Sequence, residues 1–153
     1  MNREESLDFA REYVADLLTF FGENVDIKVY AEDDIIHVDV PSTNSNSILI
    51  GRGAETLRSI QYLVSNVLRN KEAVLSRVSL DIADYKKQRE ERIAEKAREW
   101  IAEVQRTGSS HVAYINAADR RVVHQVAKEF SDVRTYSEGE GRDRRLIIAQ
   151  ISS

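Results

Sequence analysis

A long, highly charged helical segment separates two stretches of the chain that each contain short strands. Asp84 is placed as an N-cap, and apolar residues then recur at helical spacing as far as Val104. The segment ends at the polar stretch Thr-Gly-Ser-Ser of residues 107–110, which is typical of a domain boundary. The pattern predicts an α+β chain with two small domains, residues 1–106 and residues 107–153.

The first of these stretches alternates between helical and strand periodicity. Gly22 ends an amphipathic pattern, and Asp33-Asp34 lies between two runs in which apolar and polar residues alternate, as in a hairpin. A short apolar run, Ile48-Leu49-Ile50, precedes a second helical stripe. The predicted elements are a helix over 4–21, strands over 25–29 and 36–40, a helix over 57–68 and a strand over 78–82.

The second stretch is shorter and ends in a hairpin. A strand is predicted over 112–115, and Asn116 can cap a helix whose buried face runs from Val122 to Phe130. Two further strands, 133–138 and 144–151, flank the turn Gly139-Glu140-Gly141.

Composition restricts the chemistry that the chain can perform. With no cysteine, it has no disulfide, no thiolate metal site and no cysteine nucleophile, which favours a reducing cytoplasm. No apolar run is long enough to cross a bilayer, and the charged N-terminus is unlike a signal peptide. No catalytic cluster, metal-ligand cluster or cofactor motif stands out, so neither an enzyme nor a bound cofactor is expected.

Charge alone does not indicate a nucleic-acid binder. Residues 1–106 carry 15 basic and 20 acidic side chains, a net charge of −5, whereas residues 107–153 carry 7 and 6, a net charge of +1. The total of −4 is acidic, and neither part is strongly basic.

A glycine loop at the start of the second helical stripe is the most informative local motif. Gly51-Arg52-Gly53 would let backbone N–H groups approach a phosphate, and Arg52 adds a cation where the helix dipole favours negative charge. The alternative is an ordinary helix entry that uses a glycine pair.

The context of this loop resembles a known family. The run of residues 48–63, Ile-Leu-Ile-Gly-Arg-Gly-Ala-Glu-Thr-Leu-Arg-Ser-Ile-Gln-Tyr-Leu, is similar to the KH domain of the bacterial Jag (SpoIIIJ-associated) RNA-binding proteins. The resemblance implies a type II KH domain, a three-stranded sheet packed by helices, whose loop clamps about four unpaired nucleotides. It implies phosphate contacts at Gly51, Arg52, Gly53 and Arg58, with Ile50, Leu57 or Ile60 walling a groove for bases.

One position of the loop departs from the family pattern. The family loop ends in glycine, where this chain has Ala54. Alanine would weaken or alter the loop if the position requires a positive φ, and it would be harmless if the position is the first of the helix.

In the C-terminal stretch, Arg120 and His124 are one helical turn apart. An arginine can fork onto a phosphate and a histidine can stack on a base, although such a spacing is also common on a solvated helix face. Residues 116–124, Asn-Ala-Ala-Asp-Arg-Arg-Val-Val-His, resemble the R3H domain that follows KH in Jag proteins, with Ala117 in place of the family proline. Residues 135–139 and 144–148 resemble its closing hairpin, which implies a small α/β R3H domain that binds through Arg120, Arg121, His124 and Arg144.

The two resemblances together predict a cytoplasmic, non-enzymatic binder of single-stranded RNA or DNA, without the N-terminal Jag domain. Tyr62 and Tyr136 are candidates for base stacking, whereas Trp100 falls on an apolar stripe and is expected in a core. In the Jag family this role implies post-transcriptional regulation linked to cell elongation. The alternative is a protein-interaction module with a degenerate KH loop, and a small single-KH protein is the kind of partner it would bind.

Overall fold

The computed structural model describes residues 1–151, which form two compact α+β units. The N-terminal unit spans Met1–Lys86, and the C-terminal unit begins at Lys87. Each unit has its own sheet and its own hydrophobic core.

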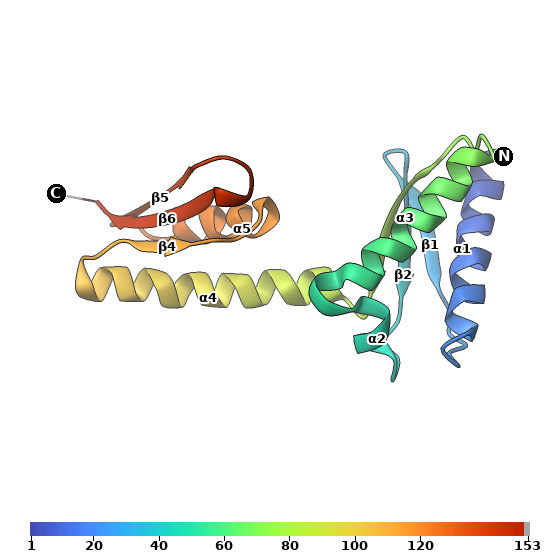
Figure 1. The fold of residues 1–153 in the computed structure, drawn as a ribbon, viewed down its shortest axis with the longest axis horizontal. Coiled ribbons are helices and arrows are strands. Elements are labelled where there is room, and N and C mark those ends of the chain that lie inside the picture. Colours follow the sequence, from blue (N-terminus) through green and yellow to red (C-terminus); the bar gives the residue numbers. More distant parts are fainter. Residues whose placement is uncertain (152–153) are drawn as a thin grey trace. The chain divides into compact units, whose positions relative to one another are not determined.

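The N-terminal unit packs helices on one face of a three-stranded sheet (Figure 1). Its strand order is β1-β2-β3, with β1 and β2 antiparallel and β2 and β3 parallel. Alternate residues of β2 and β3, such as Val38 and Leu80, are buried against Val14 and Val64 of the helices. The elements are α1 (Arg3–Thr19), β1 (Lys28–Glu32), β2 (Ile35–Val40), α2 (Asn46–Ile50), the short 3-10 helix η1 (Arg52–Ala54), α3 (Glu55–Asn70) and β3 (Arg77–Ile82).

The first strand begins three residues later than its alternating pattern suggests. A two-residue turn, Asp33-Asp34, closes the hairpin, and both residues have positive φ (49° and 64°), as tight hairpin turns require. Pairing therefore extends outward from this turn along Lys28–Glu32, and Val25 lies before the paired region.

The C-terminal unit packs two helices on one face of a second sheet (Figure 1). Its strand order is β4-β6-β5, and both pairs are antiparallel. The elements are α4 (Tyr85–Thr107), β4 (His111–Ala113), α5 (Ala117–Ala127), β5 (Val133–Glu138), the 3-10 helix η2 (Gly141–Asp143) and β6 (Arg145–Gln150).

The long helix α4 belongs to the C-terminal unit, which differs from the division predicted at residue 107. Its buried residues Ile93, Ala97 and Ile101 share one core with Val123 of α5 and Ile148 of β6. Because α4 supplies Ile93, Ala97, Ile101 and Val104 to this core, the sheet and α5 alone would leave the core open to solvent. Asp84 does not cap the helix, because it has φ of 55°, whereas the Asp81 carboxylate accepts the Lys86 N–H at 3.3 Å.

Among residues 1–151, no helix is both long enough and apolar enough to span a membrane.

Packing of α4 predicts a large effect of truncating Ile101, which is fully buried. Ile101→Ala should lower the unfolding free energy of the C-terminal unit by about 2–5 kcal/mol, because it opens a cavity between α4 and the sheet. Urea unfolding followed by the fluorescence of Trp100, the single tryptophan, reports on this unit. The exposed Lys96→Ala on the same helix is the control, and an equal effect of both substitutions would contradict this packing.

Candidate nucleic-acid interface

The start of α5 is fixed by two polar side chains. Asn116 caps the helix, because its Oδ1 accepts the N–H of Asp119 at 2.9 Å, as its sequence position predicts. The Asp119 carboxylate is itself buried and accepts a hydrogen bond of 2.6 Å from Nη2 of Arg89 on α4. The first turn of α5 is thus tied to α4 and has little freedom to tilt.

Arg120 extends back over this first turn. Its Nη1 donates to the carbonyl of Ile115 at 2.6 Å, so the guanidinium lies beside the segment that enters the helix. A pocket of about 430 Å³ opens there, and three arginines from two separate segments surround it. Its lining residues are Tyr114, Ile115, Asn116, Ala117, Arg120, Gly141, Arg142 and Arg144; we call it the arginine pocket.

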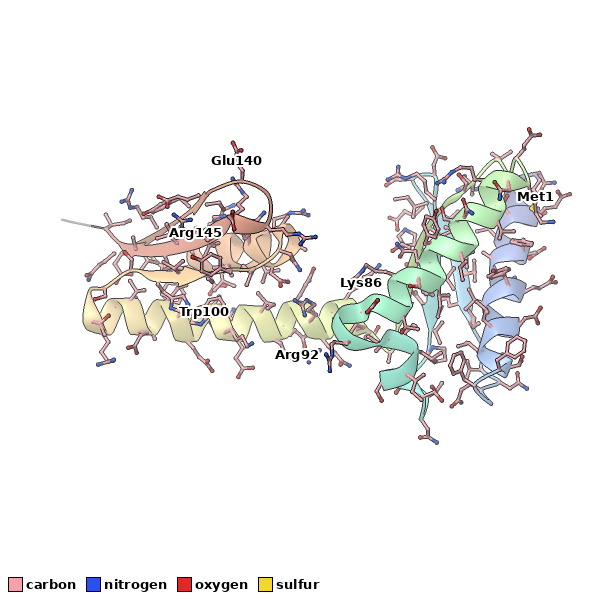
Figure 2. The ribbon with its side chains drawn as sticks, in the orientation of Figure 1. Met1, Lys86, Arg92, Trp100, Glu140 and Arg145 are labelled. Atoms are coloured by element: carbon pink, nitrogen blue, oxygen red, sulfur yellow. The ribbon has the colours of Figure 1, made fainter. Side chains whose placement is uncertain are left out.

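The hairpin between β5 and β6 supplies the other two arginines. Gly139 has φ of 87°, and a Cβ there would lie 2.8 Å from the carbonyl oxygen of Asp143, so only glycine fits this turn. Nη1 of Arg144 donates to the Gly139 carbonyl at 2.9 Å, which holds that side chain against the turn. Glu140, at the tip of the hairpin, points away from the sheet (Figure 2).

His124 lies in a different pocket from Arg120. Its Nδ1 is 2.6 Å from Oγ1 of Thr135 on β5, and Lys128 and Phe130 line the same hollow. Burial lowers the pKa of His124 below its usual 6.5, and the positive charges of Arg120 and Lys128 lower it further. At neutral pH the imidazole is therefore uncharged and serves as a hydrogen-bonding group rather than a cation.

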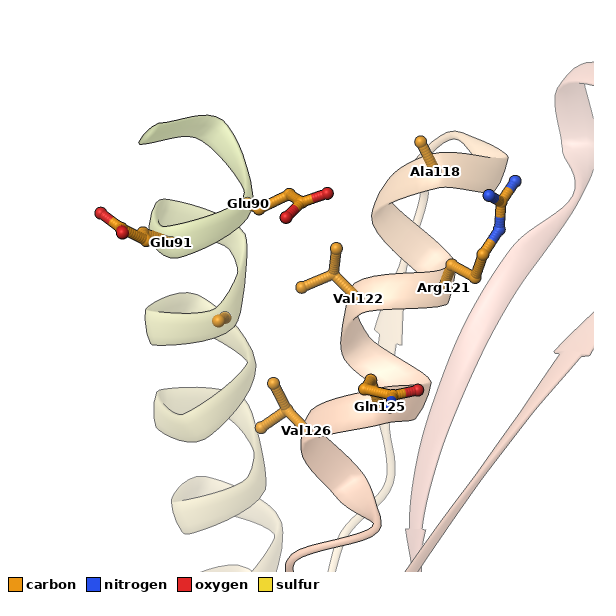
Figure 3. Close-up of a pocket in the computed structure, with 8 residues that line it drawn as sticks. Glu90, Glu91, Ala118, Arg121, Val122, Gln125 and Val126 are labelled. Carbon is orange, nitrogen blue, oxygen red and sulfur yellow. The ribbon is translucent and has the colours of Figure 1, made fainter. Parts of the chain in front are cut away.

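Arg121 borders a third, mostly apolar hollow between α4 and α5. Val122 and Val126 point from α5 toward α4, while Glu90 faces them from α4 (Figure 3). Arg121 and Gln125 lie on the side of α5 away from α4 (Figure 3). With two glutamates on its other wall, this hollow is poorly suited to phosphate.

The four candidate residues of the C-terminal unit are thus distributed over three hollows. Arg120 and Arg144 meet in the arginine pocket, whereas His124 and Arg121 do not line it. Of the side chains in that pocket that could contact a phosphate or a base, sequence reasoning missed Tyr114 and Arg142. Tyr114 could have been found from its alternation with the buried Ala113, but nothing local marks Arg142.

In the N-terminal unit, Gly51 makes the tight connection between α2 and the loop. It has φ of 77°, and a Cβ there would lie 2.9 Å from the backbone nitrogen of Thr56. Arg52 and Gly53 are exposed, as a contact loop requires. Arg58 instead turns inward on the loop, where its Nη1 donates to the Gly53 carbonyl at 2.6 Å.

The loop ends in a conformation that suits glycine. Ala54, which directly precedes α3, has φ of 62° and ψ of 26°, in the left-handed region. A residue with a Cβ is disfavoured there by about 1–2 kcal/mol. Position 54 therefore has the positive φ at which alanine is less favourable than glycine, and it is not the first residue of the helix.

The proposed walls of a base groove are mostly core residues. Leu57 and Ile60 are only 3% and 8% exposed and belong to the N-terminal core, and Ile50 is partly buried against it. Ile48, Tyr62 and Leu63 are instead the exposed apolar side chains of α2 and α3.

Within residues 1–151, no group of three or more histidine and acidic side chains is arranged to hold a metal ion.

Comparison with known proteins supports a nucleic-acid-binding class. Residues 87–150 match the R3H domain family, so the C-terminal unit, including α4 from Lys87, is an R3H domain. The RNA-binding protein KhpB of Clostridium symbiosum is 32% identical over 150 residues, 96% of this chain and 68% of that protein. This chain belongs to the KhpB (Jag) family. The match confirms the family predicted from the two motifs. It is not a family of enzymes.

Other relatives are longer than the region they share with this chain. KhpB of Bacillus subtilis strain 168 is 26% identical over 106 residues, which are 67% of this chain and 51% of that protein. KhpB of Streptococcus pneumoniae D39 is 26% identical over 107 residues, 69% of this chain and 33% of that protein.

The conformation of Ala54 predicts an unusual response to glycine. Ala10 and Ala54 are both buried in the N-terminal core, but Ala10 is helical. Ala10→Gly should cost about 2 kcal/mol, from one lost methyl group and the lower helix propensity of glycine. Ala54→Gly loses the same methyl group but relieves the left-handed strain, so its cost should stay below about 1 kcal/mol. Urea unfolding followed by circular dichroism compares the two, and equal costs would contradict a strained Ala54.

The lowered histidine pKa values predict a stability that depends on pH. His124 and His111 both have a pKa below 6.5 in the folded protein, so the unfolded chain binds protons first as the pH falls. The contribution of these two histidines to the free energy of unfolding is therefore fully present above pH 6.5, and it is lost as the pH falls below that value. The thermal midpoint should drop between about pH 7.5 and about pH 5.5, and His124→Gln should reduce that drop. A drop of the same size in the variant would show that His124 is not its source.

Proposed function

We propose that this chain binds single-stranded RNA, with the arginine pocket of the R3H domain as its principal phosphate site. The observation that carries this proposal is the convergence of Arg120, Arg142 and Arg144 from two segments on one pocket with the exposed Tyr114. Guanidinium groups bind phosphate through paired N–H donors, and an adjacent aromatic ring offers a surface for an unpaired base. The relatives, named as RNA-binding proteins, support RNA as the ligand.

His124 and Arg121 take lesser roles in this proposal. His124 is held by Thr135 and supports the packing between α5 and β5, close to the proposed path of the RNA. Arg121 contributes only long-range positive charge, because it does not line the arginine pocket.

The N-terminal unit is proposed to be a type II KH domain. Its order of helix, two strands, short helix, loop, helix and strand, with a parallel β2–β3 pair, supports this assignment. Gly51, Arg52 and Gly53 form the proposed backbone clamp, and Arg58 shapes the loop through the Gly53 carbonyl. Two modest contacts on one strand would raise the affinity of an otherwise acidic chain through effective concentration.

A cytoplasmic location and a part in post-transcriptional regulation linked to cell elongation remain predictions from the sequence and its family resemblance. Binding of DNA in place of RNA is likewise a prediction.

A protein-interaction module is the second candidate function, and the strained Ala54 favours it. A loop that no longer clamps a backbone would leave the N-terminal unit to bind a partner such as a small single-KH protein. Binding of that partner should then be unaffected by Arg52→Ala, whereas RNA binding by a functional loop should weaken.

RNA binding can be tested with a short, labelled single-stranded RNA at several salt concentrations. Arg120→Gln and Arg142→Ala should each weaken binding by about tenfold, because each removes a charged contact to phosphate. Each should also reduce the slope of log affinity against log salt by about 1. Fluorescence anisotropy measures both quantities.

The control for this experiment is Arg106→Ala, which removes the same charge from the exposed end of α4, where Arg106 pairs with Glu103. Its affinity should stay close to that of the wild type. Wild-type protein that does not bind RNA would refute the proposed function, and an equal loss in all three variants would refute the arginine pocket as its site.

A further inference from the structure

The sheet of the C-terminal unit presents its two faces to different surroundings. His111 and Thr135 point toward the helices, because the His111 ring stacks on Trp100 at 4.8 Å and Thr135 contacts His124. Their neighbours Val112 and Tyr136 therefore lie on the opposite face. The register places these two on either side of Ile147, so all three form one row across the strands.

This opposite face is apolar at its centre and bears an aromatic ring beside a cation. Ile147 is only 7% exposed although it points away from the helices, and Val112 beside it is 45% exposed. The guanidinium of Arg134, two residues before Tyr136 on the same face, lies 5.2 Å from the centre of the Tyr136 ring. No segment among the described residues of this unit packs over the face as α4 and α5 do over the other.

The same face continues into the arginine pocket. Tyr114 directly follows β4 and is 71% exposed, whereas its neighbours Ala113 and Ile115 are directed inward. By strand alternation Tyr114 thus lies on the side of Val112, and it also lines the arginine pocket. Tyr114 and Tyr136 are two strands and two residues apart, or roughly 12 Å from the usual strand spacings.

We propose that this face is a stacking surface for two unpaired bases of the RNA strand whose phosphates occupy the arginine pocket. We call it the tyrosine face, and it consists of Val112, Tyr114, Arg134, Tyr136 and Ile147. This proposal rests on the proposed function and adds that the protein contacts bases of the RNA as well as its phosphates. Each tyrosine stacks one base, and Val112 and Ile147 provide the apolar floor between them.

Charge on the tyrosine face favours a nucleic acid as its occupant. Arg134 leaves its donors available to a phosphate while its plane lies near the Tyr136 ring. Glu138, two residues after Tyr136 on β5, is paired with Arg145 at 3.0 Å. Continuity with three further arginines through Tyr114 gives one path for a negatively charged strand across the unit.

The experiment pairs protein variants with RNA that lacks bases. The 153-residue chain is titrated into a labelled oligouridine of about eight nucleotides, and into an abasic ribose-phosphate oligomer of the same length. Tyr136→Ala should weaken binding to oligouridine by about tenfold or more, since stacking of one base is lost. Tyr136→Phe, which keeps the ring, should bind as the wild type does. On the abasic oligomer Tyr136→Ala should have no effect.

Tyr114→Ala and Tyr114→Phe should repeat this pattern, whereas Arg120→Gln should weaken binding to both oligomers because it contacts phosphate. Unfolding followed by Trp100 fluorescence checks that each variant is folded, and the phenylalanine variants keep the test decisive where alanine destabilises the sheet.

The outcomes separate the two proposals. If the wild type binds and Arg120→Gln weakens binding, but Tyr136→Ala binds oligouridine like the wild type, only the tyrosine face is refuted. An equal loss on the abasic oligomer would also refute stacking. If the wild type binds neither oligomer, the proposed function fails, and the tyrosine face fails with it.

Discussion

The carboxylate of Asp119, buried in the first turn of α5, joins that helix to Arg89 of α4. A buried acid without a cationic partner would be strongly destabilising, so the two helices are held in one arrangement. That arrangement sets the direction of the helix start, from which Arg120 reaches the Ile115 carbonyl and borders the arginine pocket. The site therefore depends on α4 although α4 contributes no side chain to it, which agrees with an R3H match that begins at Lys87.

The two candidate RNA contacts differ in how their backbone is supported. In the C-terminal unit, the tight hairpin position is occupied by Gly139, and any residue with a Cβ there would clash with the backbone of Asp143. In the N-terminal unit, a left-handed position is occupied by Ala54, and Arg58 holds the preceding carbonyl. Strain of this kind persists only where surrounding packing over-determines it, and Ala54 is indeed buried in the core. The loop is therefore held by the core and not by its own sequence preference.

Periodicity was sufficient to predict the helices, the hairpins and the cap at Asn116, because each depends on residues near one another in sequence. It could not predict the partner of α4, since the stripe of Ile93, Ala97 and Ile101 shows which side of the helix is buried but not what covers it. The same limit applies to the site. Helical spacing correctly placed Arg120 and His124 one turn apart, yet the Ile115 carbonyl and the Thr135 hydroxyl draw them into different hollows. Arg142 joins the pocket only through the fold of the hairpin.

An acidic total charge is compatible with RNA binding when opposite charges are separated locally. The glutamates Glu90 and Glu91 lie by the hollow between α4 and α5, on a different part of the unit from the arginine pocket. Screening at physiological ionic strength, with a Debye length of about 8 Å, weakens the effect of acids that lie farther from a bound phosphate than the arginines around it. Stacking adds a contribution that salt and net charge barely affect, because it depends on the faces of the rings. A domain with a net charge near zero can thus bind a polyanion through a few placed cations and exposed aromatic rings.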